Sequence, residues 1–289
     1  MPAQSAHPHA EALMTDTTEQ DRAHPLPHSS RDAARVQHVP DTPQTRAPSY
    51  RLAFTDRDFL LREELRPVRL QLELLKPQMV MDEHGIESTV VMFGGARIPA
   101  PDGAPRDARS PALAEMSKYY TEARQFARLM TERSLAQGGK DLVICTGGGP
   151  GVMEAGNLGA HEVGGQSIGL GIVLPHEQAP NPYVSPDLCF NFHYFAIRKM
   201  HFLMRARAIT VFPGGFGTLD ELFEALTLIQ TGRMARIPVL LFGAEFWDGI
   251  INWQALARAG TISATDLDLI RYVETADEAV AIIDAWTPA

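Results

Sequence analysis

The spacing of hydrophobic positions changes along the chain, and from residue 88 onward it predicts alternating strands and helices. Short, unbroken apolar runs occupy residues 89–93, 142–145, 168–173, 208–212, 238–242 and 271–273. Between them, apolar residues recur every three or four positions over 112–135, 152–163, 194–206, 219–231, 246–258 and 276–286. Unbroken apolar runs are typical of strands buried on both faces of a parallel sheet, and the longer period is typical of helices. The pattern therefore predicts a doubly wound α/β fold: a mainly parallel, Rossmann-like sheet with helices on both faces.

The first 87 residues do not follow this alternation. Residues 1–50 contain seven prolines and no glycine, and only seven of them are large apolar or aromatic residues. Such a segment cannot bury enough apolar surface to offset its ordering entropy, so we predict a disordered tail over 1–50. Residues 55–75 have a helical pattern in which Pro67 either kinks one helix or stands at the first position of a second. We predict a helical prefix over 51–87 and the main domain over 88–289.

Composition narrows the class of protein. The chain is 45% hydrophobic and carries a formal net charge of −9, so the basic footprint of a nucleic-acid-binding protein is absent. No apolar run is long enough for a transmembrane helix, and no secretory signal pattern opens the chain. Two cysteines, Cys145 and Cys189, cannot make a disulfide framework. We expect a cytoplasmic globular protein that binds neither nucleic acid nor a membrane.

Three glycine-rich loops follow predicted strands, at the sheet edge where ligands bind in such folds. They are Phe93-Gly-Gly-Ala-Arg97, Thr146-Gly-Gly-Gly-Pro-Gly-Val-Met-Glu154 and Pro213-Gly-Gly-Phe-Gly-Thr-Leu-Asp-Glu221. The second and third lead into helices, whose first amides and positive dipole end make an anion site. Neither contains Gly-Lys-Ser/Thr or reads G-x-G-x-x-G, which argues against a Walker A loop and against dinucleotide redox chemistry. We expect a small phosphate-bearing ligand instead.

Charged residues surround the third loop. The pattern places Asp220 and Glu224 near the start of the predicted helix, where acidic side chains complement the helix dipole. Glu221 is expected to face the same cleft as the loop amides. Arg198 and Lys199, upstream of the preceding strand, supply positive charge.

Together these residues resemble the Lonely Guy (LOG) family of cytokinin-activating nucleotide phosphoribohydrolases. The family's P-G-G-x-G-T-x-x-E stands here as Pro213–Glu221, and its upstream Arg-Lys as Arg198-Lys199. The loop Gly147-Gly-Gly-Pro-Gly-Val-Met153 is a variant of a second family motif, found in bacterial members named as Rossmann-fold or lysine decarboxylase-like proteins. The resemblance covers roughly residues 88 to 286.

The resemblance implies hydrolysis of the N-glycosidic bond of a nucleoside 5′-monophosphate, AMP or an N6-modified AMP, to free base and ribose 5-phosphate. It implies that Glu221 stabilises the ribosyl cation or activates water, as carboxylates do in glycoside hydrolysis, and that Arg198 orients Glu221 or the leaving base. It assigns substrate binding to the glycine loops and to neighbouring polar residues: Gly147, Gly148, Gly149, Gly151, Met153, Glu154, Glu177, Asn181, Lys199, Gly214, Gly215, Gly217, Thr218 and Thr227. It also implies a homodimer or higher homo-oligomer.

We expect neither a metal nor a cofactor. Pyridoxal phosphate chemistry needs a Schiff-base lysine, and of the four lysines (Lys76, Lys118, Lys140 and Lys199) only Lys199 lies near the expected site. The alternative hypothesis is a non-catalytic carrier or sensor that uses the same loops to hold a nucleotide or cofactor, because a fold does not fix a function.

Overall fold

The computed structural model describes residues 26, 28–101, 111–175 and 179–287, which form two compact units divided between Arg69 and Leu70. The described part of the first unit holds short helices that bury no residue: α2 (Ser29–Arg35), η2 (Val36–His38), α3 (Pro43–Arg46), η3 (Pro48–Tyr50), α4 (Arg57–Leu60) and η4 (Glu63–Leu65). Several of them fall in the range for which the sequence predicts a tail. The boundaries at residues 50 and 87 stay predictions.

Helix α5 (Arg66–Glu83) resolves the question raised by Pro67. The helix begins one residue before this proline, so Pro67 stands in its first turn, where a missing N–H leaves no intrahelical bond unmade. The helix continues to Glu83, past the predicted end at residue 75, and includes Pro77.

The second unit contains a seven-stranded, all-parallel sheet in the order β4-β3-β2-β1-β5-β6-β7. The strands are β1 (Thr89–Phe93), β2 (Val143–Thr146), β3 (Ser167–Ile172), β4 (Cys189–Phe192), β5 (Ala206–Val211), β6 (Val239–Phe242) and β7 (Ile270–Val273). The apolar runs predicted six of the seven; β4 was not predicted. It is a four-residue edge strand in which Asn191 is exposed between two buried phenylalanines, so it has no unbroken apolar run. The predicted α/β fold is confirmed.

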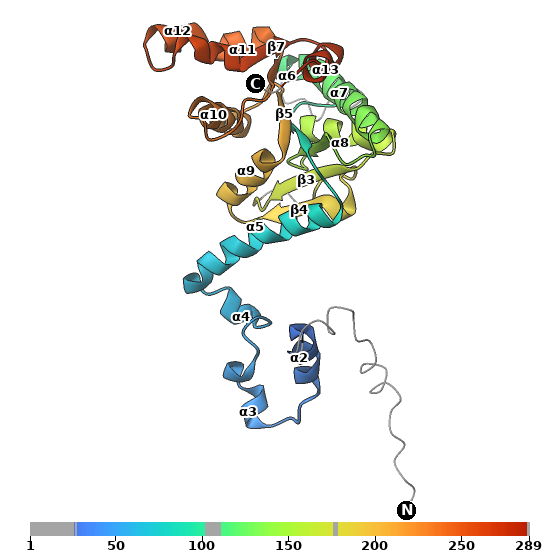
Figure 1. Cartoon of the computed structure of the whole chain (residues 1–289), viewed down its shortest axis with the longest axis vertical. Helices are drawn as coiled ribbons and strands as arrows, with labels where there is room; N and C mark the ends of the chain where they lie inside the picture. Colours follow the sequence, from blue (N-terminus) through green and yellow to red (C-terminus); the bar gives the residue numbers. More distant parts are fainter. Residues whose placement is uncertain (1–25, 27, 102–110, 176–178, 288–289) are drawn as a thin grey trace, which may run out of the picture. The chain divides into compact units, whose positions relative to one another are not determined.

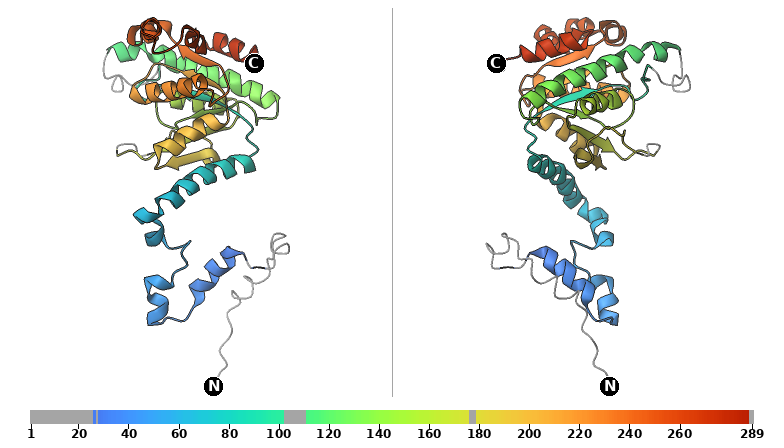
Figure 2. Two further views of the ribbon diagram at one scale, coloured as in Figure 1. Left: turned by 60° about the vertical axis from the view of Figure 1, so that its left-hand side comes forward. Right: turned by 90° about the vertical axis from the view of Figure 1, so that its right-hand side faces the viewer.

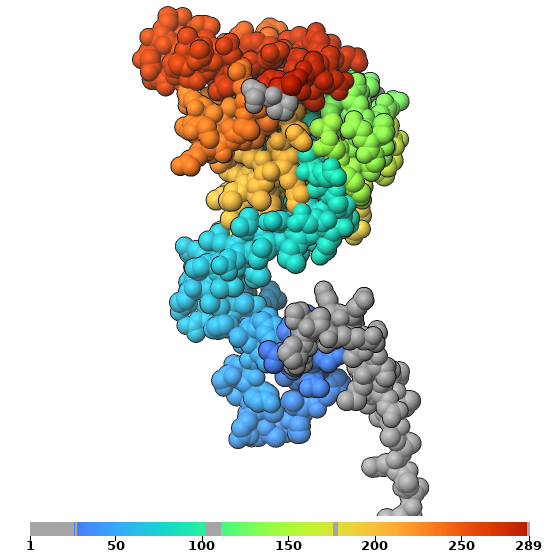
Figure 3. All heavy atoms as spheres, in the orientation of Figure 1, coloured from blue at the N-terminus to red at the C-terminus, as the bar shows by residue number. Residues whose placement is uncertain are grey.

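Helices cover both faces of this sheet (Figures 1 and 2). They are α6 (Pro111–Glu115), α7 (Ser117–Ala136), α8 (Val152–Glu162), α9 (Phe195–Met204), α10 (Phe216–Gln230), α11 (Ala244–Ile250), α12 (Trp253–Arg258) and α13 (Ala276–Asp284), with η5 (Pro186–Leu188) and η6 (Ala264–Leu269) in loops. Figure 3 shows α9 (gold) and α10 (orange) beside each other at the surface.

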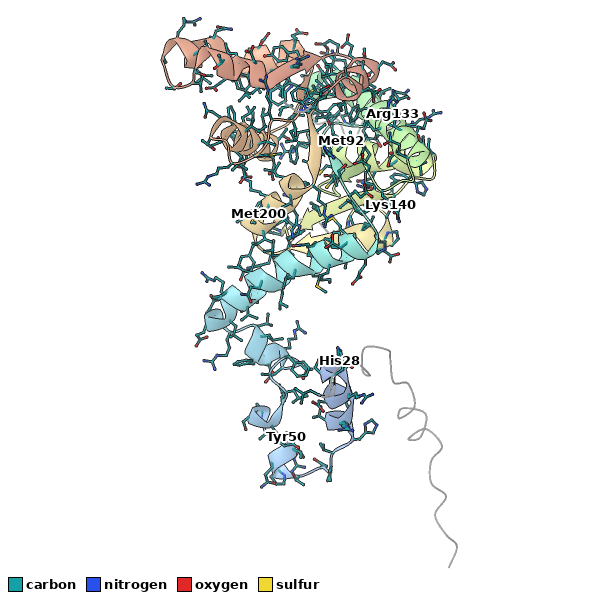
Figure 4. The ribbon with its side chains drawn as sticks, viewed as in Figure 1. His28, Tyr50, Met92, Arg133, Lys140 and Met200 are labelled. Atoms are coloured by element: carbon teal, nitrogen blue, oxygen red, sulfur yellow. The ribbon has the colours of Figure 1, made fainter. Side chains whose placement is uncertain are left out.

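Strand β1 shows how the sequence builds two cores. All five of its residues are buried, and they alternate between the faces of the sheet as strand geometry requires. Val90 and Met92 (labelled in Figure 4) pack in the cluster that α7, α8 and α13 cover. Val91 and Phe93 pack in the opposite cluster, with residues from α5, α9, α10 and α11.

The strand order reverses direction at β1. From β1 the chain adds β2, β3 and β4 on one side, and then returns to add β5, β6 and β7 on the other. Such a point leaves a crevice at the carboxyl ends of the two central strands, where ligands bind in doubly wound folds. The loops after β1 and β5 meet at this crevice.

Candidate active site

A cleft of about 870 Å³ opens at the carboxyl ends of β1 and β5. Its lining combines the glycine loops after these strands with the first turns of α10 and one face of α9. The predicted residues that line it are Gly147, Met153, Arg198, Gly214, Gly215, Gly217, Thr218 and Glu221. The structure therefore brings together both residues expected to be catalytic and most of the Pro213–Glu221 motif.

The N-terminus of α10 points its first amides at this cleft. The helix begins at Phe216, and no side chain in the described part of the chain caps it. The first amides of a helix lack intrahelical partners and carry the positive end of the dipole, so they suit an anion. Gly214 is required here because a Cβ at this position would collide with the Thr218 hydroxyl. The phosphate-binding role of the loop stays a prediction.

Arg198 and Glu221 form a nearly buried pair within the cleft. Arg198 Nη1 lies 3.7 Å from Glu221 Oε1, and the two side chains are 13% and 10% exposed. Arg198 Nε also donates to the Leu170 carbonyl oxygen at 2.7 Å, which ties the guanidinium to the end of β3. Because α9 and α10 each contribute one partner, the spacing of the pair depends on how these two helices pack.

Burial raises the pKa of Glu221 to about 7, since the carboxylate loses hydration. Arg198 and Lys199 act in the opposite direction, while the neighbouring carboxylates of Glu224 and Asp220 raise the pKa further. A carboxyl group with a pKa near neutrality can take up and release a proton at physiological pH, as a general base or acid does.

Lys199 was predicted to bind substrate, but it lies outside the cleft lining. Its Nζ lies 3.0 Å from Asp220 Oδ2 and 3.0 Å from Glu224 Oε2, which raises the pKa of the lysine against the opposing effect of burial. Because α10 begins three residues earlier than predicted, Asp220 and Glu224 lie beyond its first turn. Their expected role at the helix dipole is therefore wrong: they hold Lys199, and Lys199 does not line the cleft.

A buried network of polar side chains fixes the second glycine loop. Asn181 Nδ2 donates to the Gly149 carbonyl oxygen at 3.0 Å and to Asn157 Oδ1 at 2.9 Å. The Asn181 amide donates to the Gly148 carbonyl oxygen, and the Gly148 amide donates to Thr146 Oγ1. Asn181 was predicted to contact substrate, but its polar groups are used inside the protein, so the structure gives it a supporting position.

Other predicted residues also lie away from the cleft. Gly151, with φ of +70°, caps α8, where a Cβ would collide with the Gly95 carbonyl oxygen. Glu154 accepts a hydrogen bond from the Tyr120 hydroxyl at 3.1 Å. Thr227 is exposed and donates to the Phe223 carbonyl oxygen of its own helix. Neither Glu154 nor Thr227 lines the cleft, and Glu177 lies outside the described residues.

The sequence did not predict the apolar wall of the cleft. Its large side chains come from the start of the α6–α7 segment and from α9 and α11: Leu113, Met116, Phe195, Phe246 and Ile250. Arg97, in the loop after β1, also lines the cleft and is exposed. Arg97 could have been predicted from its position after the central strand. The apolar wall could not, because its residues come from segments that are far apart in the sequence.

Within the described ranges, no three His, Cys, Asp or Glu side chains group to hold a metal ion. Over the same ranges, no helix has both the length and the apolar character needed to cross a membrane.

Several known proteins are similar to this chain. The family described as "Possible lysine decarboxylase" matches residues 153–283. Cytokinin riboside 5′-monophosphate phosphoribohydrolase LOG2 of Arabidopsis thaliana is 25% identical over 173 residues, which cover 59% of this chain and 77% of that protein. The pyrimidine/purine nucleotide 5′-monophosphate nucleosidase of Escherichia coli (strain K12) is 33% identical over 121 residues, 37% of this chain and 25% of that protein.

A solved structure, the molybdenum cofactor binding protein from the phototrophic bacterium Rippkaea orientalis, aligns with a TM-score of 0.44 and 18% identity over 69% of this chain and 96% of that one. The family match spans the third glycine loop and its upstream arginine, which the structure joins in one cleft. Over this segment the chain is similar to the LOG and lysine decarboxylase-like family.

Proposed function

We propose that this protein is a nucleotide phosphoribohydrolase: it hydrolyses the N-glycosidic bond of a nucleoside 5′-monophosphate. The observation that carries the proposal is the nearly buried Arg198–Glu221 pair, which lies in one cleft with the uncapped N-terminus of α10. The names of two sequence relatives, a phosphoribohydrolase and a nucleotide 5′-monophosphate nucleosidase, support the same class of reaction.

The phosphate binds at the start of α10. The amides of the Gly214–Thr218 segment and the Thr218 hydroxyl supply donors, and the helix dipole favours the anion. Thr218 and Glu221 are one turn apart on the buried side of α10. A phosphate at the helix end therefore directs the attached ribose toward the carboxylate.

The reaction requires two contributions from the protein: electrostatic stabilisation and one group that carries a proton. The C1′–N bond breaks with its electron pair going to the base, and positive charge develops on the ribose. Glu221 in its carboxylate form stabilises this charge and accepts a proton from the attacking water, whose oxygen bonds to C1′. The proton then passes to the base, so the products are a neutral base and ribose 5-phosphate. Arg198 stays protonated throughout and orients Glu221.

The apolar wall of Leu113, Met116, Phe195, Phe246 and Ile250 would face the base end of the substrate. An adenine, or an adenine with an apolar group on N6, buries more apolar surface there than a smaller pyrimidine does. We therefore propose AMP or N6-modified AMP as substrate. With an N6-prenylated adenine the released base would be a cytokinin.

We also propose that the protein is a homodimer. Exposed large apolar side chains gather on the helices that cover one face of the sheet, α5, α9 and α10: Leu72, Leu75, Met79, Met200, Met204 and Phe223. Met200 is labelled on α9 in Figure 4. Such a concentration of apolar surface is typical of a protein–protein contact.

The direct test is to incubate the purified full-length protein with AMP, isopentenyladenosine monophosphate, GMP and CMP separately. Free base and ribose 5-phosphate are then quantified together. We expect equal amounts of both products, with the fastest release from an adenine nucleotide. Glu221→Gln should lose turnover by about a thousandfold or more while it retains nucleotide affinity, because the neutral amide neither stabilises the cation nor accepts a proton.

Glu224→Gln is the matched control, since Glu224 lies one turn further along α10 and contacts Lys199 outside the cleft. We expect its turnover to stay within about threefold of wild type. Full turnover in Glu221→Gln would contradict the mechanism. A folded wild-type protein that binds a nucleotide and returns it unchanged after hours would favour the carrier hypothesis.

A further inference from the structure

One carboxylate of helix α5 contacts the two residues that precede α9. Glu73 Oε1 accepts a hydrogen bond from the His193 amide at 2.9 Å, and Glu73 Oε2 accepts one from the Tyr194 amide at 3.0 Å. Tyr194 is the N-cap residue of α9, whose own side chain does not cap the helix. The Tyr194 amide, at the N-cap, has no intrahelical partner, so the carboxylate satisfies it and also holds the residue before it.

The same helix holds the other end of α9. Arg205, the C-cap residue of α9, places Nη2 2.5 Å from Asp82 Oδ1 and donates from Nη1 to the Ile86 carbonyl oxygen at 2.6 Å. Asp82 lies in the last turn of α5, and Ile86 follows the helix. Glu73 and Asp82 therefore bond opposite ends of α9 from one helix (Figure 2 shows α5 in cyan beside α9 in gold).

Between these two ends, α9 turns a third polar group toward α5. His201 is 3% exposed, and its Nε2 donates to the Glu73 carbonyl oxygen at 3.3 Å. Hydrogen bonds at three places, the two ends of α9 and His201 between them, therefore restrain α9 against sliding or rotation relative to α5.

Helix α9 carries the basic groups of the site. Arg198 lies 3.7 Å from Glu221, and Lys199 holds Asp220 and Glu224 on the same neighbouring helix. A shift of α9 by a fraction of an ångström changes the Arg198–Glu221 distance directly, since the two partners stand on different helices.

We propose that α5 is a positioning element of the active site and that Glu73 is a positioning residue: its carboxylate fixes α9 so that Arg198 stands against Glu221. This inference deepens the proposed function and rests on it for its catalytic consequence. Glu73 itself does not line the cleft and contacts no reacting atom. Its substitution acts on the catalytic step through the position of α9, which carries Arg198.

The pKa of Glu221 distinguishes this proposal from a simple loss of stability, because that pKa depends on the charges around Glu221. Arg198 and Lys199 face Glu221 from α9 and lower its pKa, while Asp220 and Glu224 on α10 raise it. If Glu73→Ala loosens α9, Arg198 moves away and the pKa of Glu221 rises. The direct effect of removing one negative charge has the opposite sign, because it would lower that pKa. The direction of the change therefore separates the two effects.

The experiment uses the full-length chain with its glutamate carboxyl carbons labelled with carbon-13. Glu221→Gln identifies the Glu221 resonance, which is then titrated by NMR in wild type, Glu73→Ala, Asp82→Asn and Glu83→Ala. Glu83 is the matched control, since it is exposed at the end of the same helix. We expect Glu73→Ala to raise the pKa of Glu221 by about half a unit or more, Asp82→Asn to raise it less, and Glu83→Ala to leave it unchanged.

Base release is measured on the same samples. We expect Glu73→Ala to lower kcat about tenfold with a smaller change in KM, because the phosphate site on α10 is untouched. Glu73→Gln, whose amide oxygen still accepts a hydrogen bond, should recover part of the loss and serves as the test variant if Glu73→Ala does not fold. An unchanged Glu221 pKa in a folded Glu73 variant overturns the proposal. A wild-type protein that releases no base overturns the proposed function instead, and the titration still decides what α5 does.

Discussion

Two opposing effects act on the protonation state of Glu221. The proposed reaction needs a carboxylate, while the burial that shields this carboxylate disfavours its charge and raises its pKa to about 7. The ionised fraction of Glu221 therefore changes steeply across physiological pH. Arg198 and Lys199 keep the pKa from rising further, so the basic face of α9 determines how much carboxylate is present at a given pH.

This pKa predicts how turnover depends on pH. If the ionised form of Glu221 is the active form, kcat rises about tenfold per unit below pH 7 and levels off above it. The measurement is base release from saturating AMP between pH 5 and 9 in buffers of constant ionic strength. A kcat that stays flat through this range would show that Glu221 does not act as a carboxylate in the slow step.

The same shift predicts that Glu221 destabilises the folded protein at high pH. The carboxyl group has a pKa near 4.5 in an unfolded chain and about 7 when folded, so between these values the folded state binds more protons. Stability therefore falls as the pH rises from 4.5 to 7, and about 3 kcal/mol is lost above that range. Glu221→Gln, which does not titrate, should gain about that much free energy of unfolding relative to wild type between pH 4.5 and pH 8.

Urea unfolding of both proteins at these two pH values measures the difference, and comparison within each pH removes the contribution of all other groups. Glu245→Gln, at an exposed position on α11, is the control variant. A stability difference between wild type and Glu221→Gln that is the same at both pH values would show that the folded environment does not disfavour the carboxylate. A gain in stability with a loss of turnover is the trade-off expected of a residue kept for function.

At the scale of elements, the second glycine loop depends on side chains that never reach the cleft. Asn157 on α8 accepts from Thr146 Oγ1 at 2.7 Å and from Asn181 Nδ2 at 2.9 Å, and it donates to Ser167 Oγ at 2.9 Å. It joins β2, β3 and the segment at Asn181 into one buried network below Gly148 and Gly149. Each polar group left unpaired in such a place costs about 1–3 kcal/mol.

We therefore expect Asn157→Ala to lower the free energy of unfolding by about 2–4 kcal/mol and to raise KM more than it lowers kcat. The loop loses its support, while the Arg198–Glu221 pair keeps both helices that position it. Urea unfolding and steady-state base release measure the two effects, and Asn191→Ala, at an exposed position on the edge strand β4, is the control. A stability equal to that of wild type would mean that the network contributes nothing net.

The sequence predicted these elements unevenly, for physical reasons. Strands buried on both faces reveal themselves by unbroken apolar runs, whereas β4 alternates buried Phe190 and Phe192 with exposed Asn191 over four residues and lacks that signal. The glycine loops are local motifs, so the proposed phosphate site could be predicted before the fold was known. The resemblance to a known family paired Arg198 with Glu221, and no local pattern would have done so.

Positions that depend on packing between distant segments could not be predicted. The apolar wall joins Leu113 near α7 to Phe246 on α11, residues that are far apart in sequence. The family resemblance assigned Asn181 and Lys199 to substrate binding. The folded chain instead gives them the Gly149 carbonyl and the α10 carboxylates as partners.

At the scale of the whole molecule, the proposed dimer follows from where apolar surface is left uncovered. The exposed apolar residues of α9 and α10 lie on the helices that carry Arg198 and Glu221, and those of α5 lie on the proposed positioning helix. Burial of such side chains against a second copy contributes about 25 cal/mol per Å² of apolar area. An interface on these helices would also restrain α5 and α9, so assembly and turnover should be linked.

We expect the double substitution Leu75→Lys and Met79→Lys to shift the protein from dimer to monomer and to lower kcat. These two residues are 49% and 55% exposed and lie one turn apart on α5. In a monomer a charge at either position stays hydrated and costs little free energy, whereas burying that charge in an interface costs much more. Sedimentation velocity and base release are measured over the same concentration range. Leu135→Lys, at a 42% exposed position on α7 across the sheet, controls for added charge. A wild-type monomer at every concentration would exclude the dimer, and a monomeric variant with full turnover would show that assembly does not support the site.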